Sequence, residues 1–359
     1  MSLELVDRRR FFSTAAAGVG TVAAVGSASA APKTRIKIGQ IGVAHGHATK
    51  LSVYRESQDY EVVGIVEPNQ ELRNRAEHHP AFKDLPWMTQ DDLLGQSDLQ
   101  VVLIETSPKD SLAVAGACVA AGKHIHLDKP AGESLVQFEK ILSQADHQKL
   151  LVQMGYMYRY NPAIVLLRQF ISQGWLGEIY EVHSVMSKVL DIGSRRGLVA
   201  YPGGMMFELG CHLLDLVVKL LGEPQHVASF RRHSADHSDT LQDNMLAVLE
   251  YPKAIASVKS SAMEVEGFER RHLVVVGTEG TMHIQPLDDP KVRLAFNRTR
   301  GQYKSGYQDI SMPKYARYVD DAADMAQVVR GEKPSDFSYQ HDLSVQRTVL
   351  KACQMPLDH

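Results

Sequence analysis

The first half of the chain alternates short apolar runs with amphipathic segments, a pattern that predicts strands and helices in turn. The apolar runs are of strand length and rich in β-branched residues, and they lie at 36–41, 61–66, 99–106, 123–127 and 150–154. Helix-compatible segments separate several of them, among them 111–121 and 137–149. Strands that alternate with helices favour a parallel, doubly wound sheet.

From about residue 163 the pattern changes to segments in which apolar and polar positions alternate. Such alternation is typical of antiparallel strands with one buried face, and the segments lie at 179–189, 245–249, 254–258, 272–276 and 281–284. The residues 277–280 form a hairpin-type turn between the last two. Helices are predicted at 164–173, 318–329 and 343–353. The predicted fold is therefore α/β, with an open, mostly antiparallel sheet in the C-terminal half.

The length of the chain also indicates two domains. Its 359 residues are many for a single hydrophobic core. The change of pattern places the boundary near residue 157, which gives a doubly wound domain at 34–157 and an α/β domain at 158–359.

Several polar residues follow the predicted parallel strands, at the edge where such sheets bind ligands. The turn after the first strand places Gly42, Ala44 and His47 at the three glycine positions of the dinucleotide fingerprint GxGxxG, so only the first position matches. Glu67 lies 25 positions after Gly42, where an acid can bind an adenosine ribose. No Arg or Lys follows it closely to pair with a 2′-phosphate, which predicts NAD rather than NADP. The predicted cofactor-binding residues are Gly42, Ala44, His45, Gly46, His47, Glu67, Thr106, Pro108 and Lys129.

The apolar stretch 203–221 is a second candidate site. It begins with a glycine pair and is predicted to continue as a helix, on which Glu208, His212 and Asp215 would share one face. An imidazole flanked by carboxylates suits acid–base chemistry, because a carboxylate can orient the ring and stabilise its protonated form. Taken alone, the local pattern favours a buried structural histidine instead.

Composition and charge exclude several classes of protein. The formal net charge of −3 provides no general basic surface for nucleic acid or an anionic membrane. The three cysteines are widely separated, which argues against a disulfide framework and a Cys-x-x-Cys zinc site. No metal site is predicted either, because no cysteine or carboxylate stands at ligand spacing from the paired histidines, His45, His47, His124 and His126.

The N-terminus has the features of an export signal. Arg8-Arg9-Arg10-Phe11-Phe12 precedes a weakly apolar run that ends in the small residues Ala28-Ser29-Ala30. Twin arginines before such a run are typical of the twin-arginine export route. We expect residues 1–30 to be a signal peptide, the protein to be periplasmic, and no membrane span to persist after its removal.

In their order and spacing, these motifs resemble the Gfo/Idh/MocA family, which includes glucose–fructose oxidoreductase and inositol dehydrogenase. The resemblance covers almost all of the chain after residue 30, and it is carried by 38–47, 67–69, 121–124, 128–130, 159–162, 203–215 and 277–281. It implies a Rossmann domain followed by an α/β domain whose open sheet often mediates oligomerisation. A homodimer or homotetramer is therefore expected.

The resemblance also implies site residues. The E-K-P motif of the family falls on Asp128-Lys129-Pro130 and makes Lys129 its catalytic lysine. The D-x-G-x-H-x-x-D pattern falls on 208–215 and makes His212 the proton acceptor, as in members that resemble inositol dehydrogenase. Glu208 stands for the usual aspartate and Asp128 for the usual glutamate, and both changes move a carboxylate by about one methylene.

Together these features predict hydride transfer between nicotinamide and a secondary alcohol of a sugar, glycoside or cyclitol. His212 would act as acid/base, and Lys129 would polarise the substrate oxygen. Asp215 and Glu208 would orient the imidazole. The residues predicted to bind substrate are Arg159, Tyr160, Asn161 and His212.

Two other functions stay open. One is an exported NAD-dependent glycosidase or lyase that oxidises its sugar transiently and reduces it again with the same bound NAD. Export favours this alternative, because no NAD pool exists outside the cell; the missing Tyr-x-Thr-His-Gly-type segment argues against it. The other is a non-catalytic sugar-binding protein, against which the presence of Lys129 and His212 argues.

Overall fold

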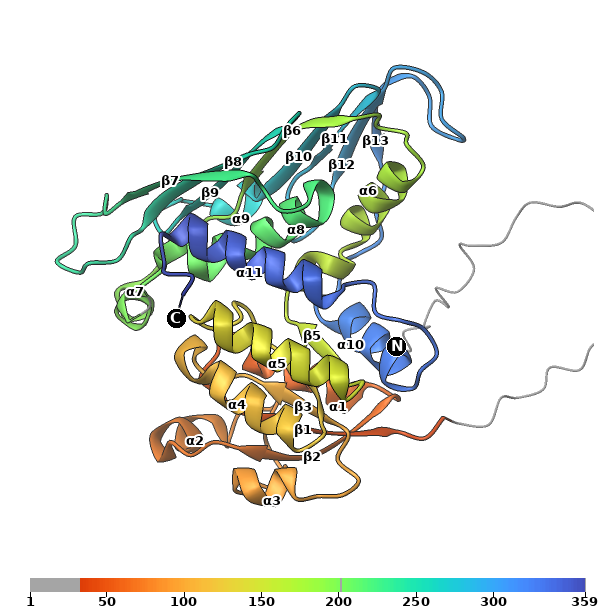
Figure 1. Ribbon diagram of the computed structural model, residues 1–359. Helices are drawn as coiled ribbons and strands as arrows, with labels where there is room; N and C mark the ends of the chain where they lie inside the picture. The colour runs from red at the N-terminus through yellow and green to blue at the C-terminus, as the bar shows by residue number, and fades with distance from the viewer. Residues whose placement is uncertain (1–32, 201, 359) are drawn as a thin grey trace, which may run out of the picture. The chain divides into compact units, whose positions relative to one another are not determined.

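Two β-sheets with their helices make up the chain from Arg35 onward (Figure 1). The computed structural model describes residues 33–200 and 202–358, so the predicted signal peptide at 1–30 lies outside the described residues. None of the helices in these ranges has both the length and the apolar character needed to cross a membrane.

The first sheet is parallel and has the order β2-β1-β3-β4-β5. Its strands are β1 (Ile36–Ile41), β2 (Tyr60–Val66), β3 (Val101–Ile104), β4 (His124–Leu127) and β5 (Val152–Met154). The helices of this half are α1 (Leu51–Glu56), α2 (Gln70–Ala76), α3 (Gln90–Leu94), α4 (Pro108–Ala120) and α5 (Leu135–His147). From β1 the chain adds β2 on one side and then β3, β4 and β5 on the other, so the predicted doubly wound sheet is confirmed.

The second sheet has eight strands in the order β13-β12-β11-β10-β6-β9-β8-β7. Only the neighbours β6 and β9 run parallel, which confirms the open, mostly antiparallel sheet. The strands are β6 (Ile179–Val185), β7 (His226–Arg232), β8 (Asn244–Glu250), β9 (Ile255–Ser261), β10 (His272–Gly277), β11 (Gly280–Ile284), β12 (Val292–Phe296) and β13 (Gly306–Ile310).

Several elements in this half, including the short helix α9 (Gly267–Arg270), have no counterpart among the predicted ones. The edge strands β7 and β13 have mostly half-buried or exposed side chains, so no apolar run marks them, and β12 was also missed. Helix α7 (Ile192–Val199) lies in a segment for which no helix or strand is predicted. The Asp191 carboxylate accepts hydrogen bonds from the Gly193 and Ser194 amides and so caps its first turn.

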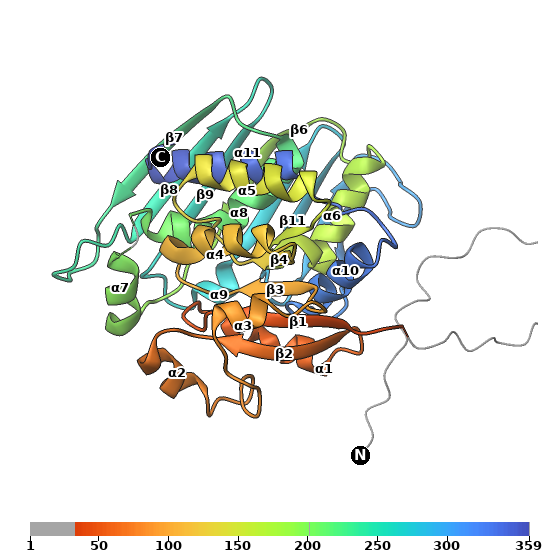
Figure 2. The same ribbon diagram turned by 60° about the horizontal axis from the view of Figure 1, so that its bottom comes forward.

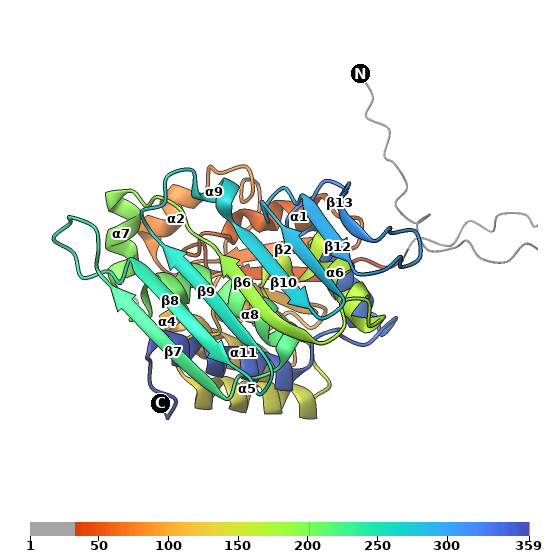
Figure 3. The same ribbon diagram turned by 90° about the horizontal axis from the view of Figure 1, so that it is seen from above.

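Helices cover one face of the eight-stranded sheet, whereas the opposite face of its strands lies in front in Figure 3. The covering helices are α6 (Pro162–Ser172), α8 (Cys211–Leu221) and α11 (Tyr339–Cys353). Helix α8 contacts β6 and β9, and α11 contacts α8 on one side and α5 on the other (Figures 1 and 2). The C-terminal helix therefore joins the two halves of the fold.

Helix α10 (Val319–Val329) belongs by sequence to the second predicted domain but packs in the core of the first. Its Ala322, Met325 and Ala326 are buried with Tyr54 of α1 and Tyr60 of β2. The Tyr60 hydroxyl also donates a hydrogen bond to the Ala322 carbonyl oxygen at 2.7 Å. The parallel sheet is thus completed by a segment more than 250 residues away along the chain.

Truncating Met325 should therefore destabilise the domain that contains the parallel sheet. Met325 is fully buried, so Met325→Ala should lower the free energy of unfolding by about 3 kcal/mol. Urea denaturation followed by circular dichroism measures the change. Gln327→Ala, an exposed position on the same helix, is the control and should have little effect. Equal stability of the two variants would show that α10 does not support this core.

Candidate active site at the carboxyl edge of the parallel sheet

The turn after β1 requires glycine at position 42. Gly42 has φ +92°, and a Cβ there would lie 2.7 Å from the backbone of Glu105 and Thr106, which follow β3. Its amide donates to the Val66 carbonyl oxygen at the end of β2. The turn therefore packs closely against the ends of β2 and β3, and a side chain at position 42 would push the turn away from these strands.

Glu67 holds the same turn from the other side. Its carboxylate accepts hydrogen bonds from the Val43 amide at 3.0 Å and the Asn69 amide at 2.9 Å. The Asn69 side chain then caps α2. These bonds keep the carboxylate at the strand end, beside the glycine turn, where an adenosine ribose binds in dinucleotide folds.

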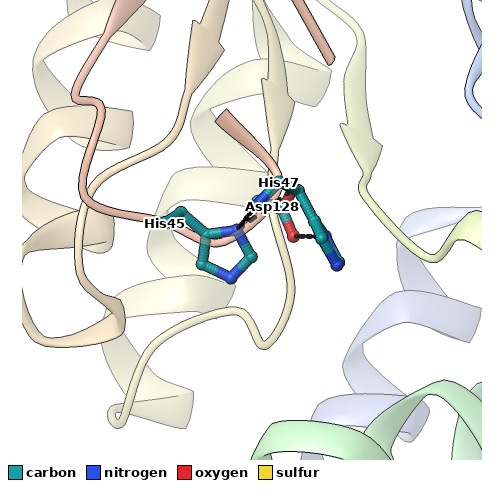
Figure 4. A group of neighbouring side chains, drawn as sticks. All are labelled: His45, His47 and Asp128. Carbon is teal, nitrogen blue, oxygen red and sulfur yellow. Dashed lines mark hydrogen bonds and ion pairs between the residues drawn. The ribbon is translucent and has the colours of Figure 1, made fainter. Parts of the chain in front are cut away.

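Two imidazoles lie in this turn, His47 at the third glycine position of the fingerprint and His45 at one of its variable positions. His45 and His47 approach Asp128 from two directions (Figure 4): His47 Nδ1 lies 3.2 Å from Oδ1, and His45 Nδ1 lies 3.5 Å from Oδ2. Burial lowers the pKa of His47 to about 4, so the ring is neutral at neutral pH. Ala44 and Gly46, by contrast, are exposed on the outer side of the turn.

A buried lysine that sequence reasoning missed lies beneath this turn. Lys50 Nζ is 2.9 Å from Glu105 Oε1 and is also paired with the Asp128 carboxylate. Lys50 Nζ also lies 2.9 Å from Nε2 of His126. The other ring nitrogen of His126, Nδ1, faces the Gln153 side chain. Two signals were present in the sequence: Glu105 follows four apolar residues directly, and Lys50 sits among apolar residues of a helix start.

Lys129 connects the two halves of the fold. It follows β4 and is buried, and its Nζ donates to the Glu208 carbonyl oxygen at 2.8 Å and lies 3.3 Å from the Glu208 carboxylate. Burial opposes the charge of this ammonium, but the neighbouring groups, Glu208 first and then Cys211 and Asp128, together outweigh burial and raise the pKa of Lys129. Lys129 is therefore a fixed cation.

The segment that carries Glu208 is not a plain α-helix. Residues Met206–Gly210 form a π-helical turn before α8 begins at Cys211. Turns of this kind shift the backbone out of the regular helical ladder and are frequent at functional sites. Here the turn presents both the carbonyl and the carboxylate of Glu208 to Lys129.

His212 is buried, and neither of its ring nitrogens has a hydrogen-bond partner among the described residues. Its ring lies between aromatic neighbours, with centroid distances of 5.9 Å to His47, 6.0 Å to Tyr156 and 5.8 Å to Tyr158. Burial, followed by the positive charge of Lys129, holds the pKa of His212 well below its usual value. The ring is thus a neutral imidazole whose proton-accepting nitrogen is not used by the protein.

Asp215 does not orient His212, which corrects the expectation from their spacing. Its carboxylate accepts hydrogen bonds from Arg159 at 2.6 and 3.1 Å and lies 3.2 Å from His341 Nε2. Arg159 also bonds Asp342 of α11. Glu208 does not bond the imidazole either, since its carboxylate pairs with Lys129. Helical spacing places Glu208 and Asp215 near His212, but each carboxylate forms its ion pair with a cation from another part of the fold, Lys129 for Glu208 and Arg159 for Asp215.

The predicted substrate-binding residues are likewise engaged inside the protein. Arg159 is buried between Asp215 and Asp342, and the Tyr160 hydroxyl donates to Asp324 at 2.6 Å. Asn161 is buried, donates to the Leu287 carbonyl oxygen and caps α6. These bonds assign structural contacts to all three side chains, so we do not place them among substrate ligands.

The remaining predicted cofactor residues follow β3. Thr106 is half-buried, and its hydroxyl donates a hydrogen bond to the Ser107 carbonyl oxygen. Pro108 is buried in the first turn of α4. Together with Gly42, Glu67 and Lys129, they lie at the carboxyl ends of neighbouring parallel strands. The glycine turn pressed on β3 and the carboxylate fixed at the end of β2 fit a dinucleotide. A neutral imidazole and a fixed cation complete a set of groups suited to proton transfer beside that edge.

Two family models match the chain. Residues 36–156 match an oxidoreductase family with an NAD-binding Rossmann fold. Residues 164–283 match the GFO/IDH/MocA C-terminal domain. The two matches fall on the two sheets described above.

Three individual proteins that resemble this chain share a quarter or less of their aligned residues with it. Bovine trans-1,2-dihydrobenzene-1,2-diol dehydrogenase is 25% identical over 186 residues, which cover 51% of this chain and 55% of the bovine protein. The aligned region thus spans little more than half of that relative. A structure from Desulfitobacterium hafniense DCB-2, described as an NADPH-dependent oxidoreductase, has a TM-score of 0.75 at 19% identity, over 89% of this chain and 95% of that one.

UDP-N-acetylglucosamine 3-dehydrogenase from Acidithiobacillus ferrooxidans has a TM-score of 0.72 at 18% identity, over 90% of this chain and 98% of that one. At such identities the two structures show a shared fold.

Removing the Arg159 charge should destabilise the protein. Arg159→Met leaves the buried carboxylates of Asp215 and Asp342 without their cation, and we expect a loss of about 3 kcal/mol in the free energy of unfolding. Urea denaturation measures it, with the exposed Arg75→Met as the control. A variant of unchanged stability with a raised KM would instead assign Arg159 to the substrate.

Proposed function

We propose that this chain, which belongs to the Gfo/Idh/MocA family of oxidoreductases, transfers hydride between a nicotinamide cofactor and a secondary alcohol. The proposed substrate class is a sugar, glycoside or cyclitol. One observation carries the proposal: the buried, neutral His212, with both ring nitrogens unbonded, lies near the fixed cation Lys129 at the cofactor edge. A purely structural histidine would bond at least one nitrogen when buried.

The chain's own residues divide the work of alcohol oxidation. The nicotinamide, when bound, supplies the hydride acceptor. His212 accepts the carbinol proton at one of its free ring nitrogens and returns it in the reverse direction. Lys129 Nζ donates a hydrogen bond to the same oxygen, and its charge stabilises the developing alkoxide. Glu208 holds that ammonium in place through the 3.3 Å ion pair.

The cofactor we propose is NAD. Gly42 would let the dinucleotide approach the backbone, and the Glu67 carboxylate would accept hydrogen bonds from the adenosine ribose. The residues after Glu67 are Pro68, Asn69 and Gln70, which provide no cation for a 2′-phosphate.

Export and self-association complete the proposal. Arg8-Arg9-Arg10-Phe11-Phe12 supports export by the twin-arginine route to the periplasm, with a folded protein that takes its cofactor along. Exposed large apolar side chains on the strands of the eight-stranded sheet support a homo-oligomer; they are Tyr180, Phe230, Ile255 and Tyr307.

Replacing Glu67 tests the cofactor preference. Glu67→Gln removes a charged acceptor and should weaken NAD binding about tenfold while affecting NADP much less. Titration of NADH and NADPH fluorescence gives both affinities. The nearby exposed Glu71→Gln is the control. If the wild-type chain binds NADPH more tightly than NADH, the preference proposed here is wrong.

Replacing Lys129 or His212 tests the chemistry. Lys129→Met and His212→Gln should each lower kcat by about 10²- to 10⁴-fold, because each removes a proton-transfer or charge-stabilising group. NADH formation over a panel of sugars, glycosides and cyclitols is the measurement, with the exposed His226→Gln as the control. Turnover that survives both substitutions contradicts the mechanism. Release of free sugar without net NADH would identify the glycosidase alternative.

A further inference from the structure

We propose that His45, His47 and Asp128 (Figure 4) bind a divalent transition-metal ion of the Zn²⁺ class at the turn after β1, with Glu105 as a further carboxylate. The ligand atoms of the first three residues all lie within 4.8 Å of one another. Nothing in the dinucleotide fingerprint calls for histidine at either position. The proposal is independent of hydride transfer, because it concerns side chains to which the proposed reaction assigns no step.

The spacing of the donor atoms matches a metal's coordination sphere. Bonds of about 2.0–2.1 Å to a tetrahedral Zn²⁺ place neighbouring ligand atoms about 3.3 Å apart. His47 Nδ1 is 3.2 Å from Asp128 Oδ1, and His45 Nδ1 is 3.5 Å from Asp128 Oδ2. Figure 4 shows the two rings turned toward the carboxylate from different sides. Small rotations of the two rings would bring all three donors onto one ion.

Acceptor atoms face one another around His45 Nδ1. This nitrogen accepts a hydrogen bond from the His47 amide at 3.3 Å, so in this arrangement it carries a lone pair and no proton, and a bound ion would take the place of that bond. Two carboxylate oxygens, Glu105 Oε2 and Asp128 Oδ2, each lie 3.5 Å from the same nitrogen. Glu105 Oε2 is fully buried and has no hydrogen-bond partner among the described residues. Lone pairs that face one another in a buried site call for a cation between them.

The charge of the cluster also favours a cation. The carboxylates of Glu105 and Asp128 are both buried, and Lys50 is the ammonium paired with them. The positive charge of Lys129 is matched by Glu208 on the other side. Two carboxylates and one ammonium leave a net negative charge in a low-dielectric site, which a divalent ion would offset.

The surroundings suit a metal site in two further respects. Lys50 and the backbone amide of Lys129 hold the two oxygens of Asp128 in place, as outer partners of a ligand carboxylate do. Gly46, between the two histidines, is exposed, and the His47 side chain is 19% exposed, so one of the three ligands can be reached from solvent. Two imidazoles with carboxylates, and no thiolate, select Zn²⁺, Mn²⁺ or Fe²⁺ over soft ions.

Metal binding can be measured on the full chain without activity. The protein should be produced without a histidine tag, stripped with a chelator and titrated with Zn²⁺ against a chromophoric competitor. We expect one Zn²⁺ per chain, confirmed by elemental analysis. Co²⁺ bound in its place should give visible absorption bands in the chain with both histidines.

Matched variants decide whether these residues are the ligands. His45→Gln and His47→Gln should each weaken Zn²⁺ binding by at least about 100-fold, since even outer-shell changes cost 10- to 100-fold, and should remove the Co²⁺ bands. His226→Gln, an exposed histidine, should bind as the wild type does. Circular dichroism checks that the variants fold. A wild-type chain that binds no Zn²⁺, or glutamine variants that retain its affinity, would overturn the proposal; nuclear magnetic resonance showing a protonated His45 ring would identify the proton as the bridging cation.

Discussion

The buried ammonium of Lys50 is the constraint on which the carboxyl edge of the parallel sheet depends. Strands β3 and β4 are neighbours in register, with Ile104 opposite Leu127, so the residues that follow them, Glu105 and Asp128, come together. Two buried carboxylates at the ends of adjacent strands would repel each other strongly. Lys50 lies against both and makes their proximity tolerable. The glycine turn, which rests on Glu105, and Lys129, which follows Asp128, depend on this pairing for their positions.

A second contact, between Lys129 and Glu208, fixes the position of the other half of the fold relative to the parallel sheet. Lys129 at the end of β4 bonds both the carbonyl and the carboxylate of Glu208 in the π-helical turn before α8. His212 lies one turn further along that helix, so the same contact fixes the imidazole relative to the cofactor edge. Arg159, Asp215 and Asp342 hold α8 to α11 by buried ion pairs. The proposed acid–base residues, His212 and Lys129, therefore have rigid support on both sides, although neither bonds the other.

The proposed roles of the polar residues differ in how far they can be read from spacing. His212 and Lys129 were assigned through motifs whose order along the chain is characteristic of the family, and the structure brings both to the same edge. Asp215 was placed beside His212 by helical spacing, yet it bonds Arg159 and His341. Spacing predicts which side chains share a helix face, whereas bonds form with the strongest charged partner within reach, and Arg159 comes from another element.

Apolar periodicity was sufficient for the two sheets, because burial of alternating or continuous apolar runs depends on residues close in the chain. It was insufficient for β7 and β13, whose side chains remain partly exposed at the sheet edges. The polar cluster around Asp128 lay beyond sequence reasoning for a different reason. His45 and Lys50 come from one segment, whereas Glu105 and Asp128 come from two others, and no local spacing relates the three segments. Strand order alone brought those charges into one buried site, and with them the donors of the proposed metal ion.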